Sequence, residues 1–364
     1  MLDEKETGKL NDQNSRPRGH AIALYSGGLD SALAILLMQR QNIEVTALMF
    51  MTHFGCDLGD RSSCGFNPYP TAEKFGFNVK LIHLGQKFID MVINPQYGRG
   101  KNMNPCTDCR IMMLSEAREF MEMTNADFIV TGEVLGQRPM SQVKDKLNLV
   151  IKKSNLQGKL LRPLSAKLLK PTDAELSGLV DRNLLEGISG RGRKRQIELA
   201  GEFGLEDYPS PASGCLLTDE GYSYRLRDLL EHTERITFND LNLLRAGRQF
   251  RLDPKTKVIS GRDERDNKMI LAYKEPEHIQ IEAVDVGSPI TLLVGDATDE
   301  NLQTAAAITA RYCAARKNPR VEVAVRVGCQ DERLLEVAPA GSKMLGNLRI
   351  GGPHTGGESR YGPE

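Results

Sequence analysis

The sequence predicts an α/β fold in which a parallel sheet is followed by a helical connecting region and a small α+β domain. Two observations support this fold class. Strand-length apolar runs alternate with helix-length stretches from residue 20 to residue 133, which is the pattern of a parallel sheet covered by helices on both faces. A second alternation, richer in strands, begins near Ile236, after a helical stretch that is interrupted by Pro163 and Pro171.

Four runs in the first part of the chain have the composition of buried strands. They cover residues 20–25, 44–51, 77–84 and 126–133, and the stretch 109–124 has the length of a helix. Parallel strands need a crossover connection, which is usually a helix. We therefore expect one parallel sheet within a domain over residues 19–165.

The rest of the chain divides into regions of different composition. Residues 166–235 are expected to form helices that carry a basic turn and a distal cysteine, and residues 236–335 a small α+β module around a long helix at 300–317. The polar segment 1–18 is expected to be a flexible arm, and the segment 336–364, rich in glycine and proline, a tail.

Composition places the chain among ordinary globular proteins, with 40% hydrophobic and 26% charged residues. The longest aliphatic run, Ala32–Met38, is too short to cross a bilayer, and the N-terminal segment lacks the apolar core of a signal peptide. We therefore expect a cytoplasmic protein without a membrane segment. Its seven cysteines should then be reduced, as metal ligands, catalytic groups or buried thiols.

The strongest motif is Ser26-Gly27-Gly28-Leu29-Asp30-Ser31, between a predicted strand and a predicted helix. Backbone N–H groups in such a loop can bind an anion, and the helix N-terminus adds partial positive charge. No lysine of the Walker type follows. A glycine turn with a capping side chain is the simpler interpretation, but six residues in this order at a strand–helix junction favour a phosphate site.

This loop resembles the SGGxDS signature of the PP-loop ATP pyrophosphatases, which have an adenine nucleotide α-hydrolase-like fold. The resemblance implies that the chain binds ATP with Mg²⁺, holds the pyrophosphate in the loop and transfers AMP to a substrate oxygen. It implies that Asp30 faces the magnesium-bound phosphates. It also implies nucleotide contacts from four further loop residues, Ser26, Gly27, Gly28 and Ser31.

Two more positions are expected at the nucleotide because they end strands of the sheet. Met49 is near the end of the second predicted strand, and Gly132 follows the fourth; ligands of open α/β sheets bind at the carboxyl edge of the strands. The segment Thr131-Gly132-Glu133 is similar to the TGH segment of tRNA 2-thiouridylases, with Glu133 in place of the histidine.

Three cysteines lie in loop-like surroundings. Cys106 and Cys109 form a CxxC, and Cys215 follows about a hundred residues later. A structural zinc site has four ligands, and Cys56 or Cys64 is available as the fourth, so zinc is one interpretation of this set.

The CxxC segment and the segment around Cys215 resemble the sulfur-transfer site of the tRNA 2-thiouridylases. In that family two cysteines carry and release sulfur, and Cys109 and Cys215 match them. Cys106 stands where those enzymes have an aspartate. A CxxC with one distant cysteine is the pattern of related, cluster-dependent thiolases. This resemblance implies a [4Fe–4S] cluster on Cys106, Cys109 and Cys215 with one iron open to hydrosulfide; a persulfide relay is the alternative. Cys313 is expected to be a buried apolar thiol.

Overall charge is balanced, with 48 basic and 48 acidic residues, so a nucleic acid must be attracted by local patches. Four basic residues form a compact run, namely Arg191, Arg193, Lys194 and Arg195. Such a run is often only a solvated helix start, but its place before Cys215 favours RNA binding. Arg225 and Arg227 on the next predicted helix extend the patch.

The segment from about Ser260 to Val327 is similar to the NFACT RNA-binding module. The similarity lies in Gly261-Arg262 with Asn267, a GSP loop and the helix that contains ITARY. It implies an RNA partner.

Together, these features indicate ATP-dependent thiolation of a tRNA uridine, with Asp30, Cys109 and Cys215 as the catalytic residues. The expected partners are tRNA and a sulfur-donor protein or inorganic sulfide. The alternative is a PP-loop sulfurtransferase or amide-forming ligase that acts on a small molecule. Such an enzyme would need no RNA module, so the last hundred residues distinguish the two.

Overall fold

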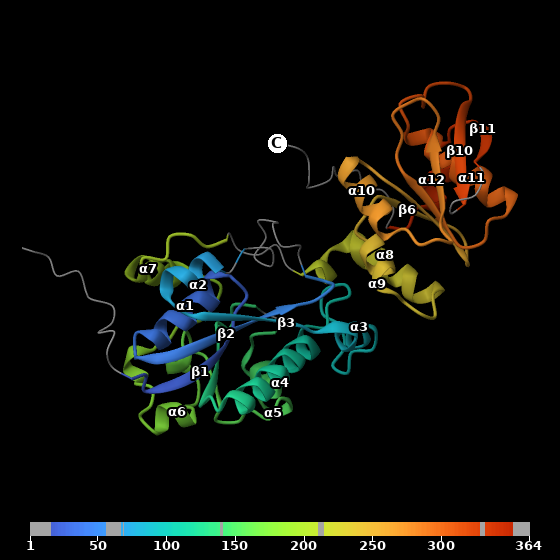
Figure 1. The fold of residues 1–364 in the computed structure, drawn as a ribbon. Helices are drawn as coiled ribbons and strands as arrows, with labels where there is room; N and C mark the ends of the chain where they lie inside the picture. Colours follow the sequence, from blue (N-terminus) through green and yellow to red (C-terminus); the bar gives the residue numbers. More distant parts are fainter. Residues whose placement is uncertain are drawn as a thin grey trace, which may run out of the picture. The chain divides into compact units, whose positions relative to one another are not determined.

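The computed structural model describes residues 16–55, 67, 69–138, 141–209, 215–327 and 332–351. The chain divides into two compact units, Met1–Thr218 and Asp219–Glu364 (Figure 1). Each unit has its own buried apolar core.

The first unit is built on a five-stranded, entirely parallel sheet in the order β3-β2-β1-β4-β5. Its strands are β1 (Gly19–Leu24), β2 (Ile43–Met51), β3 (Asn78–His83), β4 (Phe128–Thr131) and β5 (Leu160–Leu161). Leu24 pairs with Leu48 on one side and with Thr131 on the other. The carboxyl ends of β1, β2 and β4 therefore share one edge. The predicted parallel sheet is confirmed, although β5 was not expected.

Helices cover both faces of this sheet. The α-helices of the first unit, within its described residues, are α1 (Leu29–Gln39), α2 (Tyr69–Phe75), α3 (Gly85–Ile93), α4 (Cys106–Thr124), α5 (Lys144–Lys153), α6 (Asp173–Leu176) and α7 (Lys194–Phe203). Figure 1 shows α1, α2 and α7 over one face and α4 and α5 over the other. Successive strand residues point to opposite faces: Ala21 and Ala23 pack with α1, and Ile22 and Leu24 with α4.

The second unit contains a six-stranded antiparallel sheet in the order β11-β10-β8-β9-β7-β6. Its strands are β6 (Arg248–Asp253), β7 (Thr256–Ser260), β8 (Ile279–Ala283), β9 (Thr291–Val294), β10 (Val321–Val327) and β11 (Arg333–Val337). Its helices are α8 (Glu220–His232), α9 (Phe238–Leu243), α10 (Glu264–Tyr273), α11 (Asp299–Tyr312) and α12 (Ser342–Leu348). The α+β character is confirmed, and Cys313, directly after α11, is buried as expected.

The segment expected to be a tail from residue 336 is partly structured. It contains the end of β11 and then α12, whose Leu345 packs into the core of the second unit. A helix of seven residues spans only two turns, too few for a recognisable period. The rest of that segment, from 352, is outside the described residues, as are residues 1–15 of the expected arm.

The helical region expected over residues 166–235 contributes to both units, since α6 and α7 belong to the first and α8 to the second. The residue limits given above for the domains stay predictions. Among the residues that the structure describes, none of the helices combines the length and the apolar character needed to span a bilayer.

Candidate active site

The Ser26–Ser31 loop joins β1 to α1, as the sequence predicts. Gly27 has a φ of +75°, which favours glycine. The Ser31 hydroxyl donates to the carbonyl of Gly28 at 2.8 Å and accepts from the backbone N–H of Ser26 at 3.3 Å. The loop is therefore held by its own side chains, with the N-terminus of α1 directly behind it.

Gly132 brings the end of β4 against this loop. A Cβ atom at Gly132 would lie 2.5 Å from the carbonyl group of Asp30 and from the nitrogen of Ser31, a separation that only glycine permits. Met49, the other strand-end position predicted to contact nucleotide, is buried in β2, where it pairs with Leu81. Its nucleotide contact stays a prediction.

In the described structure, only one of the two carboxylate oxygens of Asp30 has a hydrogen-bond partner. Oδ2 accepts from Nε2 of Gln137 at 2.9 Å and lies 3.8 Å from Nη2 of Arg193. Oδ1 is buried and has no hydrogen-bond partner among the described residues. A buried carboxylate oxygen without a donor is costly unless a ligand satisfies it, and oxygen is the ligand that Mg²⁺ prefers. The site therefore fits a magnesium ion.

Arg193 reaches the nucleotide loop through a glycine turn. The backbone N–H of Gly190 donates to the carbonyl of Leu135 at 2.8 Å, and Leu135 forms a parallel bridge with Ser189. Within the described ranges, Nε of Arg193 is buried without a hydrogen-bond partner. Two buried polar atoms, one on an arginine and one on an aspartate, thus lack partners at the same loop.

The basic run is divided by its contacts. Arg195 forms ion pairs with Glu186, Glu198 and Glu202, whereas Arg193 pairs with Asp30. Arg191 and Lys194 are exposed. The RNA-binding role of this run stays a prediction. The structure adds that the side chain of Arg193, the residue before α7, lies beside Asp30 of the nucleotide loop.

The structure brings the three predicted cysteines together. Cys106 and Cys109 lie on the first turn of α4, and Cys215 precedes a short 3₁₀ helix, Leu216–Thr218. The backbone N–H of Met103 donates to the carbonyl of Leu217 at 3.1 Å, which ties the two segments to each other. Cys215 Sγ lies 3.7 Å from the carbonyl oxygen of Phe54.

The other two cysteines influence the ionisation of Cys109. The pKa of the Cys109 thiol is raised to about 12, mainly by burial; within that net value Arg110 acts to lower the pKa, and the charges of Cys215, Cys106 and Asp108 act to raise it. None of the four cysteines in the described ranges forms a disulfide. The sulfur atoms of Cys106, Cys109 and Cys215 do not all lie within 4.8 Å of one another. Three thiolates at this wider spacing suit an iron–sulfur cluster better than the ligand shell of a single zinc ion. Cys56 and Cys64, considered as a fourth zinc ligand, are outside the described residues.

A buried ion network connects the cysteines to the sheet. The carboxylate of Glu133, after β4, lies 3.2 Å from Nε of Arg110 and 2.9 Å from Nε of Arg162. Thr131 donates its hydroxyl proton to the same carboxylate at 3.2 Å. Burial alone would raise the pKa of Glu133, but Arg110 and Arg162 together lower it. Glu133, which replaces a histidine of the related motif, is thus an ionised structural partner.

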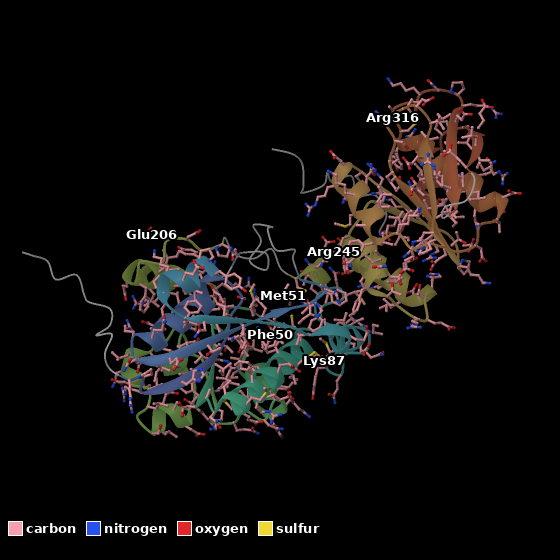
Figure 2. All side chains as sticks on the ribbon, in the orientation of Figure 1. Phe50, Met51, Lys87, Glu206, Arg245 and Arg316 are labelled. Atoms are coloured by element: carbon pink, nitrogen blue, oxygen red, sulfur yellow. The ribbon has the colours of Figure 1, made fainter. Side chains whose placement is uncertain are left out.

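Sequence reasoning did not single out Arg110, Arg162 or Gln137. Arg110 follows the second cysteine of the CxxC, and Gln137 lies five residues after Gly132, so their positions beside known motifs were the available signal. Through Gly132, Glu133 and Arg110 the nucleotide loop and the thiols are linked at one edge of the sheet. Figure 2 marks Phe50 and Met51 at the carboxyl end of β2, which belongs to the same edge of the sheet.

Comparisons with known proteins agree with both halves of this description. Residues 17–167 match the family model described as "Thiamine biosynthesis protein (ThiI)", and residues 247–348 match the "NFACT protein RNA binding domain".

Individual relatives are similar over part of their length. A probable tRNA sulfurtransferase from Thermococcus kodakarensis is 28% identical over 156 residues, which are 40% of this chain and 37% of that protein. A tRNA-specific 2-thiouridylase MnmA from Salinibacter ruber is 25% identical over 236 residues, 60% of this chain and 58% of that protein. The chain thus spans between about a third and three fifths of these two relatives.

A solved structure of a 4-thiouridine synthetase–RNA complex with bound ATP is 16% identical, covers 51% of this chain and 52% of its own, and has a TM-score of 0.32. The resemblances expected from SGGLDS and from the C-terminal module are confirmed by the two family models, whereas the roles of the three cysteines stay predictions. The chain thus joins a segment that matches the ThiI family model to a segment that matches the NFACT RNA-binding model.

Proposed function

We propose that the chain is an ATP-dependent enzyme that thiolates a uridine of tRNA. The observation that carries this proposal is the meeting of a PP-loop and three cysteines at one sheet edge, in a chain that also contains an NFACT RNA-binding domain. The names of the relatives, a tRNA sulfurtransferase and a tRNA 2-thiouridylase, support it.

The nucleotide loop accounts for the first half of the reaction. The carbonyl oxygen of a uridine is a poor leaving group, and adenylation makes it leave as AMP. In this proposal the Ser26–Ser31 loop holds the pyrophosphate of ATP while the base oxygen attacks the α-phosphorus and pyrophosphate departs. Oδ1 of Asp30 would be a ligand for the magnesium ion, and Arg193 would supply the positive charge that the loop itself lacks.

The cysteines account for the second half. Sulfide attacks the activated carbon of the base, and AMP leaves with the original oxygen, so the exchange needs no oxidant or reductant. A [4Fe–4S] cluster held by Cys106, Cys109 and Cys215 would supply one iron without a protein ligand as the site of the sulfide. The protein contributes the position of this centre, because the Arg110–Glu133–Arg162 network fixes the first turn of α4 beside the nucleotide edge.

The test of the ATP step is the product of the nucleotide. With tRNA and sulfide present, we expect AMP and pyrophosphate, together with a thiolated nucleoside detected by mass spectrometry of digested tRNA. Asp30→Ala should lower AMP formation by about 100-fold or more, with an unchanged circular dichroism spectrum. Release of ADP and phosphate would overturn the proposal. AMP formation that depends on a small acceptor and not on tRNA would favour the alternative small-molecule enzyme.

The test of the sulfur step is the metal content. Protein purified without oxygen should be brown and contain iron and sulfide, and alanine at Cys106, Cys109 or Cys215 should remove both the colour and the thiolation. Cys313→Ala, at a buried thiol of the other unit, is the matched control and should keep the iron. Full activity in iron-free protein with bound zinc, or without any metal, would show that the cysteines act in another way.

A further inference from the structure

The second unit carries a group of arginines that converge from four separate segments of the chain. We propose that Arg225, Arg248, Arg262 and Arg349 form a binding site for the phosphodiester backbone of RNA at the β6–β7 edge of the antiparallel sheet. The inference rests on the proposed function and deepens it, because it assigns the contact with the RNA partner to particular residues. We call these four residues the arginine cluster.

Strand register brings the four residues together. Arg248 begins β6 and pairs with Ser260 of β7, two residues before Arg262. Its Nη1 donates to the carbonyl of Gly261 at 3.1 Å. Arg349 forms an antiparallel bridge with Phe250 of β6, and the N–H of Ile350 donates to the carbonyl of Gln249 at 2.9 Å. The start of β6 is thus flanked by arginines on both sides.

Arg225 joins the cluster from α8. Its Nη1 donates to the carbonyl of Leu244 at 2.8 Å, in the turn that leads into β6. Figure 2 marks the next residue of this turn, Arg245. Arg225 lies before the NFACT match, which begins at residue 247, so the proposed site includes a helix in front of the matched domain.

The guanidinium groups of Arg225, Arg248 and Arg262 are each held along part of their surface. Arg248 lies over the ring of Tyr312, with its Cζ 4.2 Å from the ring centroid. Arg262 binds the carboxylate of Asp266 through Nε at 2.6 Å and Nη2 at 3.1 Å. A guanidinium has five N–H donors, so one or two fixed contacts leave donors for a further anion. An arginine already fixed in place loses less entropy when it binds a phosphate.

The arginines of the cluster act on one another with charge of the same sign. The pKa of Arg225 is lowered to about 10, mainly by burial; within that net value the charges of Arg262 and Arg349 act to lower the pKa, and those of Asp219 and Asp266 act to raise it. Burial also lowers the pKa of Arg248, and the same two arginines add to that effect. Repulsion among like charges is relieved by a polyanion, and phosphates lie at regular intervals along RNA.

The arginines at the opposite edge of the sheet provide a contrast. Arg320 pairs with Glu336 and Arg333 with Asp299, both as exposed ion pairs with one acid for each arginine. The other acids near the cluster are Asp263, which caps α10, and Asp219, which caps α8 through the N–H of Tyr222. A group of like-charged arginines from four segments therefore lies at the β6–β7 edge, whereas Arg320 and Arg333 at the opposite edge are each paired with an acid.

The experiment titrates the full chain into an unmodified, fluorescently labelled tRNA transcript at several KCl concentrations. Arg248→Gln should weaken binding about 5- to 10-fold and make the salt dependence shallower by about 0.7 to 0.9 in log–log slope, the value for one phosphate contact. Arg248→Lys, which keeps the charge but not the stacked plane, should weaken binding less and keep the slope. Arg320→Gln is the matched control and should behave as wild type.

Thermal melting of each variant separates loss of binding from loss of folding. An Arg248→Gln variant that melts like wild type and binds tRNA with unchanged affinity and slope overturns the proposal. If the wild-type chain binds tRNA through Arg248 but forms no AMP, the proposed function fails while the RNA site stands. If thiolation occurs and Arg248→Gln changes nothing, the RNA site fails while the function stands.

Discussion

Arg193 and Gln137 hold one oxygen of Asp30 and leave the other without a hydrogen bond in the described structure. This asymmetry is informative because an aspartate needed only to cap the loop would have both oxygens satisfied by protein. An arginine that fixes the aspartate and also has a buried, unpartnered Nε is suited to a phosphate that arrives with the nucleotide.

Arg193→Gln should therefore lower the rate of AMP formation at low ATP by about 10- to 100-fold. A hydrogen bond to a charged group contributes about 1.5–3 kcal/mol, and about 1.4 kcal/mol is a tenfold change. Steady-state AMP release gives the measurement, with Arg195→Gln as the control on the same helix, since Arg195 is occupied by Glu186 and Glu202. Equal rates of AMP formation for both variants would show that Arg193 does not act on the nucleotide and would leave it only the RNA-binding role predicted for the basic run.

At the scale of elements, the end of β4 positions both halves of the site. Gly132 contacts the nucleotide loop, and the next residue, Glu133, holds the two arginines of the buried network. The spacing between loop and thiols therefore depends on one short strand.

Gly132→Ala should displace the loop, because the added Cβ would lie 2.5 Å from the backbone of Asp30 and Ser31. We expect at least a tenfold loss of ATP affinity, measured by titration calorimetry, with little change in secondary structure. Gly201→Ala in α7 is the matched control: nothing lies within 4 Å of its added Cβ, and alanine in a helix is favoured over glycine by about 0.5–1 kcal/mol. Wild-type ATP affinity in Gly132→Ala would show that the loop can move without cost.

Glu133→Gln should destabilise the first unit at neutral pH by about 3–5 kcal/mol, since it leaves two guanidinium groups without their buried counter-charge. The folded-state pKa of Glu133 is lowered below its ordinary value of 4.5. Its contribution is therefore complete above that value and is lost as the pH falls through the folded-state pKa. Urea unfolding of wild type and variant should show a gap at pH 7 that narrows below about pH 4.5. A gap that is constant with pH would show that ionisation of Glu133 is not the source.

The same elements show what the sequence could and could not reveal. The long strands β1 and β2 were predictable because their residues are apolar in succession, which is typical of strands covered on both faces. Strand β5 has two residues, too few for any pattern. The Ser26–Ser31 loop was recognisable because its residues are contiguous. The pairing of Glu133 with Arg162, 29 residues later, depends on the folded sheet and has no local signal.

At the scale of the whole molecule, the balance of 48 basic and 48 acidic residues makes local charge the decisive quantity for RNA binding. Acids neutralise the basic run unevenly, since Arg195 is paired with glutamates, whereas the arginines of the cluster in the second unit act on one another with like charge. We therefore expect the stronger electrostatic contribution to RNA binding from the second unit.

A chain that ends at Thr218 should separate chemistry from RNA binding. The first unit contains the nucleotide loop, the three cysteines and its own two-sided core, so ATP affinity and iron content should survive the truncation. Affinity for tRNA should fall by at least tenfold, its salt dependence should become shallower because fewer phosphates are neutralised, and thiolation at low tRNA concentration should fall with it. The measurements are ATP titration, iron analysis and tRNA titration at several salt concentrations, for the full chain and the truncated chain in parallel.

Residual tRNA binding by the truncated chain should be sensitive to Arg191→Gln and Lys194→Gln, because the side chains of Arg191 and Lys194 are exposed. A truncated chain that binds and thiolates tRNA as well as the full chain would contradict this division of labour, and would place the whole RNA interface in the first unit.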